Sequence, residues 1–243
     1  MFIRNEANLS GPRPKGSGSK RKPTRIAGGV MPTSQMVKET PEWIEPVVAT
    51  TARENTLIVV VFDRSGSMQE NGKIREARHG YNNFINEQKS IPGSADVTLT
   101  TFDDRFDVMY TRLDINNVPE LKEGRIKPRG MTKLYDAIGE AIYSVTDEHE
   151  YDGVIVLITT DGMENASTKY SADTIKELIS SRKARGWKFI FSGTSEDAAF
   201  NARAVGINNT TVYADTGIGT RMSWNAHGVE TTSYRTSVGY DEN

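Results

Sequence analysis

The 243-residue chain contains no cysteine and no long apolar stretch. The absence of cysteine excludes disulfides, thiolate nucleophiles, zinc knuckles and iron–sulfur clusters. The longest unbroken apolar run is Leu57 to Phe62, whereas a membrane-spanning helix needs about 20 apolar residues. The N-terminus also lacks an apolar segment of the length found in signal peptides. We therefore expect no membrane contact and a cytoplasmic location, with which the lack of cysteine agrees.

The formal net charge is only −2, which excludes a uniformly basic nucleic-acid-binding protein. The charge is uneven, however: residues 1–38 contain eight Lys and Arg and one acidic residue, a charge of +7, and the rest carries −9. Because residues 1–39 are rich in Gly, Pro and Ser, we expect a flexible basic arm. Such an arm could bind nucleic acid or an acidic protein surface, or serve as a solubilising tail. It has no interleaved aromatic residues, which weakens the case for base stacking.

The body of the chain, residues 55–215, alternates strand and helix patterns. A linker over 40–54 leads into it, and the linker's apolar side chains are expected to pack on the body. Residues 216–243 form a polar C-terminal extension whose pattern allows a helix. Continuous β-branched runs predict strands buried on both faces, and apolar residues at helical spacing predict helices. The expected strands are 56–62, 95–102, 106–111, 153–160, 187–193 and 210–214, and the expected helices are 73–89, 134–145, 175–179 and 196–205.

This alternation predicts an α/β fold with a mostly parallel sheet that helices cover on both faces. The segments 95–102 and 106–111 predict a hairpin, and so one antiparallel strand pair. Asp103 and Asp104, in the turn of this hairpin, are expected to be solvated. In sheets of this kind, ligands bind beyond the carboxyl ends of the strands. The residues that follow each strand are therefore the candidates for a functional site.

The first strand runs directly into the sequence DRSGS. Asp63, Ser65 and Ser67 offer one carboxylate and two hydroxyls within five residues, and Gly66 allows the backbone to turn tightly between them. A donor set made only of oxygen favours hard divalent cations such as Mg²⁺, Mn²⁺ or Ca²⁺. One carboxylate with two hydroxyls is too little for a closed calcium cage. The set is better suited to an octahedral ion that keeps water and an open position.

Two later segments can complete this set. Thr132, just before the second expected helix, offers a hydroxyl, and Asp161, at the end of the 153–160 strand, offers a second carboxylate. Both are expected at the same edge of the sheet as Asp63. Each residue also has a simpler interpretation when taken alone: Asp63 could cap a turn, and Thr132 could cap the helix that follows it.

Taken together, these residues resemble the metal-ion-dependent adhesion site of the von Willebrand factor A (vWA) domain family. The family pattern is D-x-S-x-S, then a distant Thr, then a distant Asp, and this chain follows it without departure. The matching residues are Asp63, Ser65, Ser67, Thr132 and Asp161. The stretches MTKLYDAI, TTDGMENAS and GWKFIFSGTSEDA also resemble stand-alone vWA proteins of bacteria and phages. The resemblance covers residues 55–215 and does not extend to the arm or the C-terminal extension.

The resemblance implies a Rossmann-like, doubly wound vWA fold and a protein-binding module, not an enzyme. In the family, the serines and the threonine contact Mg²⁺ or Mn²⁺ directly or through water. By this resemblance Ser65, Ser67 and Thr132 would hold the ion, with Asp63 and Asp161 in support through water. An Asp or Glu of a protein partner would complete the coordination. An ion without a direct carboxylate ligand keeps most of its positive charge and so attracts an anion.

Two other functions are compatible with the sequence. The basic arm suits a structural or assembly protein of a phage particle or other large complex, which would be found in the virion. A Mg²⁺-dependent hydrolase is the lesser alternative. Aspartyl-phosphate enzymes commonly place an acid/base Asp two residues after the nucleophile, where this chain has Ser65. There is also no G-x-S-x-G elbow and no phosphate-binding loop of the G-x-x-x-x-G-K type.

The histidines give no sign of a metal site. His79, His149 and His227 are far apart and share no ligand spacing. We expect them to be exposed or half-buried.

Overall fold

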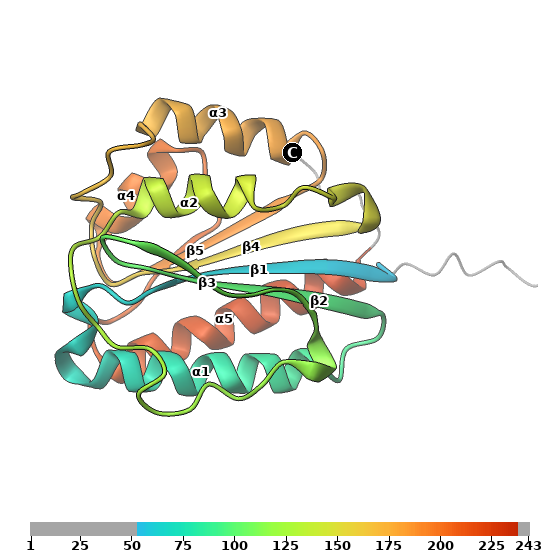
Figure 1. Ribbon diagram of the computed structural model, residues 1–243, viewed down its shortest axis with the longest axis horizontal. Helices are drawn as coiled ribbons and strands as arrows, with labels where there is room; N and C mark the ends of the chain where they lie inside the picture. Colours follow the sequence, from blue (N-terminus) through green and yellow to red (C-terminus); the bar gives the residue numbers. More distant parts are fainter. Residues whose placement is uncertain (1–52, 238–243) are drawn as a thin grey trace, which may run out of the picture. The chain divides into compact units, whose positions relative to one another are not determined.

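The computed structural model divides into two units, Met1–Pro46 and Val47–Asn243. It describes residues 53–237. The expected arm over 1–39, and the expected linker up to residue 52, therefore lie outside the described residues. Within the second unit, the described residues form one sheet with helices on both sides (Figure 1).

The strands of this sheet lie in the order β3-β2-β1-β4-β5-β6. Neighbouring strands are parallel except β2 and β3, which form the expected antiparallel hairpin at one edge. The predicted fold class, a mostly parallel α/β sheet with one antiparallel edge strand, is confirmed. The bounds are β1 (Asn55–Asp63), β2 (Ser94–Phe102), β3 (Phe106–Asp114), β4 (Gly153–Thr159), β5 (Lys188–Gly193) and β6 (Thr210–Val212).

The central strand β1 is buried on both faces, as its β-branched sequence predicts. Alternate residues from Leu57 to Val61 pack into the core on one side of the sheet. Alternate residues from Ile58 to Phe62 pack into the core on the other side. Because neither face is solvated, the strand can offer polar side chains to a ligand only where it ends, at Asp63.

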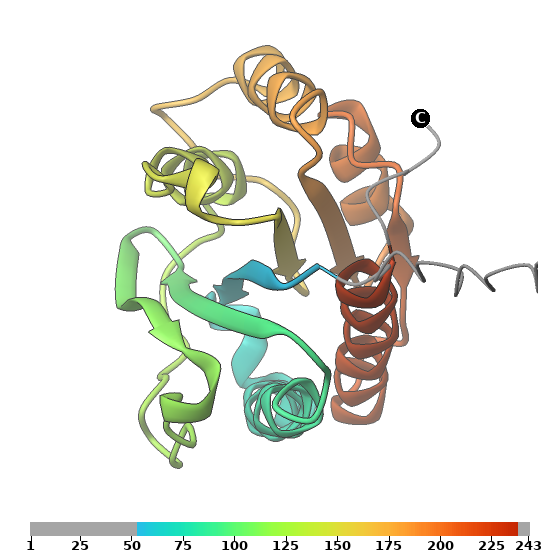
Figure 2. The ribbon, with the colours of Figure 1, turned by 90° about the vertical axis from the view of Figure 1, so that its right-hand side faces the viewer.

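Helices α1 and α5 cover one face of the sheet, and α2, α3 and α4 cover the other (Figures 1 and 2). Since the parallel strands all point the same way, the loops that follow them gather at one edge. The helices are α1 (Lys73–Gln88), α2 (Leu134–Tyr143), α3 (Ala172–Lys183), α4 (Glu196–Ala204) and α5 (Gly217–Thr236). Short 3₁₀ helices are η1 (Gly66–Gly72), η2 (Ile115–Asn117) and η3 (Glu148–Glu150).

The last helix, α5, lies in the polar C-terminal extension over 216–243, whose pattern allows a helix. Its Trp224 is 1% exposed and contacts Phe62 of β1 together with Tyr81 and Phe84 of α1. The two helices approach each other closely at Gly80, where a Cβ atom would lie 2.5 Å from Cδ1 of Trp224. Helix α5 is therefore built into the core of this unit, beside α1.

Two expectations about exposure are wrong. His227 on α5 is fully buried, whereas His79 and His149 are exposed. Asp103, expected in a solvated turn, is also fully buried, and only its neighbour Asp104 is exposed. Both errors have the same cause: the residues that cover these side chains come from distant parts of the sequence, so no local pattern signals the burial.

Candidate metal centre

The carboxylate of Asp63 lies at the end of β1 and is fully buried. Its Oδ1 accepts a hydrogen bond from the backbone N–H of Ser65 at 2.6 Å. Its Oδ2 accepts a hydrogen bond from the hydroxyl of Thr160, which directly follows β4. Strands β1 and β4 pair in parallel, so their ends lie side by side. These bonds fix the carboxylate between the two strand ends that the sequence assigns to the site.

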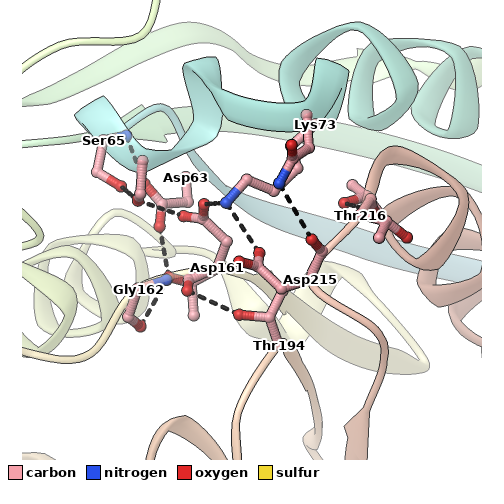
Figure 3. Close-up of polar contacts among 12 residues, drawn as sticks. Asp63, Ser65, Lys73, Asp161, Gly162, Thr194, Asp215 and Thr216 are labelled. Carbon is pink, nitrogen blue, oxygen red and sulfur yellow. Dashed lines mark hydrogen bonds and ion pairs between the residues drawn. The ribbon is translucent and has the colours of Figure 1, made fainter.

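A series of polar contacts links the loop after β1 to Asp161 (Figure 3). The hydroxyl oxygens of Ser65 and Ser67 are 3.1 Å apart. The Ser67 hydroxyl donates to Oδ1 of Asp161 at 2.7 Å. The side chain of Asp161 is fully buried. The two hydroxyls of the D-x-S-x-S sequence therefore lie in line with the second carboxylate.

Thr132 lies on a neighbouring loop that is tied to both other segments. The N–H of Gly66 donates to the carbonyl oxygen of Gly130 at 3.1 Å. The N–H of Thr132 donates to Oδ1 of Asn165 at 3.0 Å, and its carbonyl accepts from the N–H of Asn165 at 3.2 Å. Thr132 Oγ1 would be 2.7 Å from a Cβ atom at Gly162, so this glycine leaves room for the hydroxyl.

The structure thus places all five candidate residues at one edge of the sheet. Four of them form a continuous series of contacts, in the order Asp63, Ser65, Ser67 and Asp161. Thr132 adjoins this series through Gly162, the residue next to Asp161.

The charge of Asp161 affects the ionisation of Asp63. Burial and the negative charge of Asp161 raise the pKa of Asp63 to about 7, although hydrogen bonds from Thr160 and Ser65 favour the ionised form. A nearby positive charge favours the ionised state of any carboxylate. The site is therefore an environment in which a bound cation would be stabilised.

Lys73, the first residue of α1, already supplies one positive charge, and sequence reasoning missed it. Its side chain is 2% exposed, and its Nζ lies 2.5 Å from Oδ2 of Asp161 and 2.8 Å from Oδ1 of Asp215 (Figure 3). Burial disfavours the charged ammonium, but the two carboxylates outweigh this effect and raise the pKa of Lys73 above its ordinary value. Lys73 is therefore a charged, buried member of the site.

The backbone before α1 explains how Lys73 reaches the site. Asn71 and Gly72 have φ angles of 51° and 72°, both in the left-handed region. This reversal ends η1, and α1 starts directly after it at Lys73. The Asn-Gly dipeptide is a recognisable turn signal in the sequence. It could have located the start of the helix, but not the carboxylates that its first residue meets.

Asp103 anchors the rim of the site. Its Oδ2 lies 2.8 Å from Nε of Arg64 and 2.8 Å from Nε of Arg129. The N–H of Arg64 also donates to the carbonyl of Phe102 at 2.8 Å, and the N–H of Arg129 donates to the carbonyl of Arg64 at 2.9 Å. One buried carboxylate thus ties the end of β2 to the loop after β1 and to the loop that leads to Thr132.

The residues present fit an oxygen-liganded octahedral ion. Magnesium–oxygen distances of about 2.1 Å place neighbouring ligand oxygens about 3.0 Å apart in an octahedral site. The hydroxyl oxygens of Ser65 and Ser67 are separated by 3.1 Å. Among residues 53–237, no group of three or more His, Asp or Glu side chains is placed to hold a metal ion. An ion at this edge would therefore depend on the hydroxyl ligands.

Solved structures with a similar fold include proteins of pili. The PilB minor pilin from Streptococcus sanguinis is 13% identical over 76% of this chain and 63% of that chain, with a TM-score of 0.60. The vWF domain of the type V pili tip protein Mfa5 from Porphyromonas gingivalis is 10% identical over 77% of this chain and 97% of that chain, with a TM-score of 0.55. The ArnB paralog VWA2 from Sulfolobus acidocaldarius is 18% identical over 72% of this chain and 45% of that chain, with a TM-score of 0.50.

Comparison by sequence gives no relative: no family model and no curated protein matches the chain. The chain spans less than two thirds of PilB and less than half of VWA2. None of the helices within residues 53–237 has both the length and the apolar character needed to cross a membrane. At identities of 10% to 18%, the structural likeness shows the fold alone. The described part of the chain has the fold of von Willebrand factor A domains.

Proposed function

We propose that the described unit is a metal-dependent protein-binding module. Ser65, Ser67 and Thr132 would hold a Mg²⁺-type ion, for which Mn²⁺ or Ca²⁺ could substitute, and Asp63 and Asp161 would support it. An Asp or Glu of a partner protein would bind to the ion. The observation that carries the proposal is the series of contacts from Asp63 through the two serines to Asp161, with Thr132 beside it.

The choice of donors explains why such an ion would bind an acidic partner. Hydroxyl groups are neutral, so an ion held by them keeps most of its charge. The two carboxylates are buried and already hydrogen-bonded within the site. The ion would therefore be neutralised best by a carboxylate from outside. Mg²⁺ also keeps several water ligands, one of which a partner can replace.

The structural neighbours support an interaction role. They include a minor pilin, the vWF domain of a pilus tip protein and a pilus adhesin, SpaC from Lactobacillus rhamnosus GG. These are proteins whose names describe attachment or fibre assembly. An interaction or adhesion module is therefore the coarse function that the fold supports, and the dependence on metal is the finer part of the proposal.

The two alternative functions that the sequence allows, an assembly protein and a hydrolase, remain predictions. A structural or assembly role through the basic arm, with nucleic acid or an acidic surface as its partner, concerns residues outside those described. A hydrolase would need a base near Asp63, and the residue two positions later is Ser65. We propose a non-enzymatic protein, and the cytoplasmic location remains an expectation.

Direct titration of the full chain with Mn²⁺ tests the metal site. We expect one bound Mn²⁺ that Mg²⁺ displaces, measured by the electron paramagnetic resonance signal of the free ion. Loss of one metal-supporting group typically weakens binding by about 10- to 100-fold, so Ser67→Ala should fall in that range. The matched control is Ser90→Ala, an exposed serine that donates only to the carbonyl of Glu87. Binding that is absent in the wild type, or equal in both variants, would contradict the proposal.

A capture experiment tests the partner. The full chain is used as bait in a lysate of its own source, with Mg²⁺ or with EDTA, beside an Asp161→Ala variant. A protein that is retained only with Mg²⁺, and lost in the variant, would support the module. A protein that is retained regardless of metal and substitution would contradict it and favour the assembly role.

A further inference from the structure

The five-residue pattern does not explain why a buried lysine, Lys73, lies in the site. Its ammonium contacts Asp161 at 2.5 Å and Asp215 at 2.8 Å, and its side chain is 2% exposed. Placing an ammonium in a buried position is unfavourable unless carboxylates compensate it closely. The position is also fixed by a left-handed turn at Asn71 and Gly72. The cation is therefore held in place by the backbone as well as by its partners.

Both carboxylate oxygens of Asp161 face other groups of the site. Its Oδ1 accepts the Ser67 hydroxyl, and its Oδ2 faces the Lys73 ammonium (Figure 3). A divalent ion beside Ser67 would share this carboxylate with Lys73. Two cations that share one anion in a site of low polarity repel each other strongly. Lys73 thus stabilises the carboxylates when no ion is bound and opposes the ion when one binds.

We propose that Lys73 is a resident cation that sets the divalent-ion affinity of this site, and that Asp215 moderates its charge. The inference rests on the proposed function, because it concerns the same metal site. It assigns a role to two residues outside the D-x-S-x-S, Thr and Asp pattern. Asp215 precedes α5, and its side chain is 53% exposed, so it neutralises Lys73 from the solvent side.

The proposal predicts opposite effects for two substitutions. Lys73→Met removes the competing charge and should tighten Mn²⁺ binding by at least about tenfold, because even water-like screening leaves roughly that much repulsion between a unit charge and a divalent ion about 4 Å apart. Asp215→Asn leaves the charge of Lys73 less compensated and should weaken Mn²⁺ binding by about two- to fivefold, less because solvent screens an exposed group. Damage to the fold would weaken binding in both variants, so the opposite signs identify an electrostatic effect.

The control is Lys183→Met. Lys183, the last residue of α3, is half-buried, and its ammonium donates to the carbonyl oxygen of Gly206, far from the site. We expect this variant to bind Mn²⁺ like the wild type. Lys73→Met and Lys183→Met make the same change in charge and volume, so only the position relative to the site differs between them.

Stability provides a second readout that does not depend on titration. Without metal, Lys73→Met leaves Asp161 and Asp63 uncompensated, so its Tm should be lower than that of the wild type. Added Mn²⁺ should raise the Tm of this variant more than that of the wild type, since stabilisation grows with affinity. If Lys73→Met does not fold, Lys73→Gln, which also removes the charge but keeps a polar group, takes its place in both measurements.

The outcomes separate the two proposals. Wild-type protein that binds no Mn²⁺ would overturn the metal site and, with it, the role of Lys73. Wild-type binding with unchanged affinity in Asp215→Asn, and unchanged or weaker affinity in Lys73→Met, would overturn the role of Lys73 alone. Tighter binding in Lys73→Met and weaker binding in Asp215→Asn would establish it.

Discussion

The buried His227 makes a prediction about acid stability that can be worked out from its surroundings. The ring is fully buried on α5, packs edge-on to Trp224, and has its Nε2 2.9 Å from the hydroxyl of Thr159. Among the described residues, Nδ1 has no hydrogen-bond partner. Burial lowers the pKa of His227 to about 3. The folded protein therefore holds a neutral imidazole, and within residues 53–237 no carboxylate forms a hydrogen bond with it to stabilise the cation.

The sign of the pH effect follows from the difference between the folded and unfolded states. Unfolded His has a pKa of about 6.5, so between pH 6.5 and pH 3 the unfolded chain binds a proton that the folded chain does not. The contribution of the neutral His227 to the free energy of unfolding is fully present above pH 6.5 and is lost as the pH falls below this value. From pH 7.5 to pH 5.0, the free energy of unfolding should decrease by about 2 kcal/mol on account of this residue alone. The size of this decrease hardly depends on the pKa of His227 in the folded protein, provided that this pKa stays well below 5.

Urea unfolding followed by circular dichroism measures this contribution. Other groups titrate in the same range, so the wild type is compared with His227→Gln, which keeps a polar group near Thr159 but cannot be protonated. The difference in free energy of unfolding between the two proteins should shrink by about 2 kcal/mol from pH 7.5 to pH 5.0. The control is the exposed His149. The difference in free energy of unfolding between the wild type and His149→Gln should be nearly the same at pH 7.5 and pH 5.0. A constant difference between wild type and His227→Gln would refute a neutral, buried His227.

Two further substitutions test the packing beside the site. Gly80→Ala would place a methyl group 2.5 Å from the Trp224 ring, and overpacking of this kind costs about 1–3 kcal/mol. Thermal unfolding should show a lower Tm, and an unchanged Tm would mean that α1 and α5 can separate without cost. Asp103→Asn removes the charge between Arg64 and Arg129, and should cost about 2–3 kcal/mol in urea unfolding because both arginines are partly exposed. A loss below about 1 kcal/mol would show that Asp103 does not anchor the rim.

The sequence predicts most of the fold, for a physical reason. Buried parallel strands are continuous β-branched runs, and amphipathic helices repeat at 3.6 residues, so both leave local patterns. β1 and α1 are found within one residue of their predicted starts and ends. Helix α5 leaves a weaker pattern, because most of its buried positions hold Gly, Ser, Thr, His or Arg in place of apolar residues. Its place beside α1 depends on Trp224 meeting the gap at Gly80, which no local pattern records.

The candidate site likewise has a part that the sequence predicts and a part that only the folded structure shows. The D-x-S-x-S sequence is local, and the ends of parallel strands meet at one edge, so topology brings Asp161 to Asp63. Lys73 and Asp215 are separated by a large part of the chain, and only the packing of α5 on α1 brings them together. Pairs of this kind leave no periodicity and no spacing rule. The sequence therefore predicts the oxygen donors of the site, while its charge balance requires the three-dimensional structure.

The packing that joins α1 to α5 thus also determines the chemistry of the site. Gly217 at the start of α5 lies so close to Glu76 that a Cβ atom would be 2.7 Å from its Cγ, and Arg221 pairs with the same glutamate. These contacts fix the N-terminal end of α5 against the first turn of α1, and so hold Asp215 opposite Lys73. A protein that kept the five-residue pattern but changed either residue of this pair would have the same donors and a different net charge. By the role proposed for Lys73, the pattern alone would not set the ion affinity of this site; the first residue of α1 and the residue before the cap of α5 would contribute to it as well.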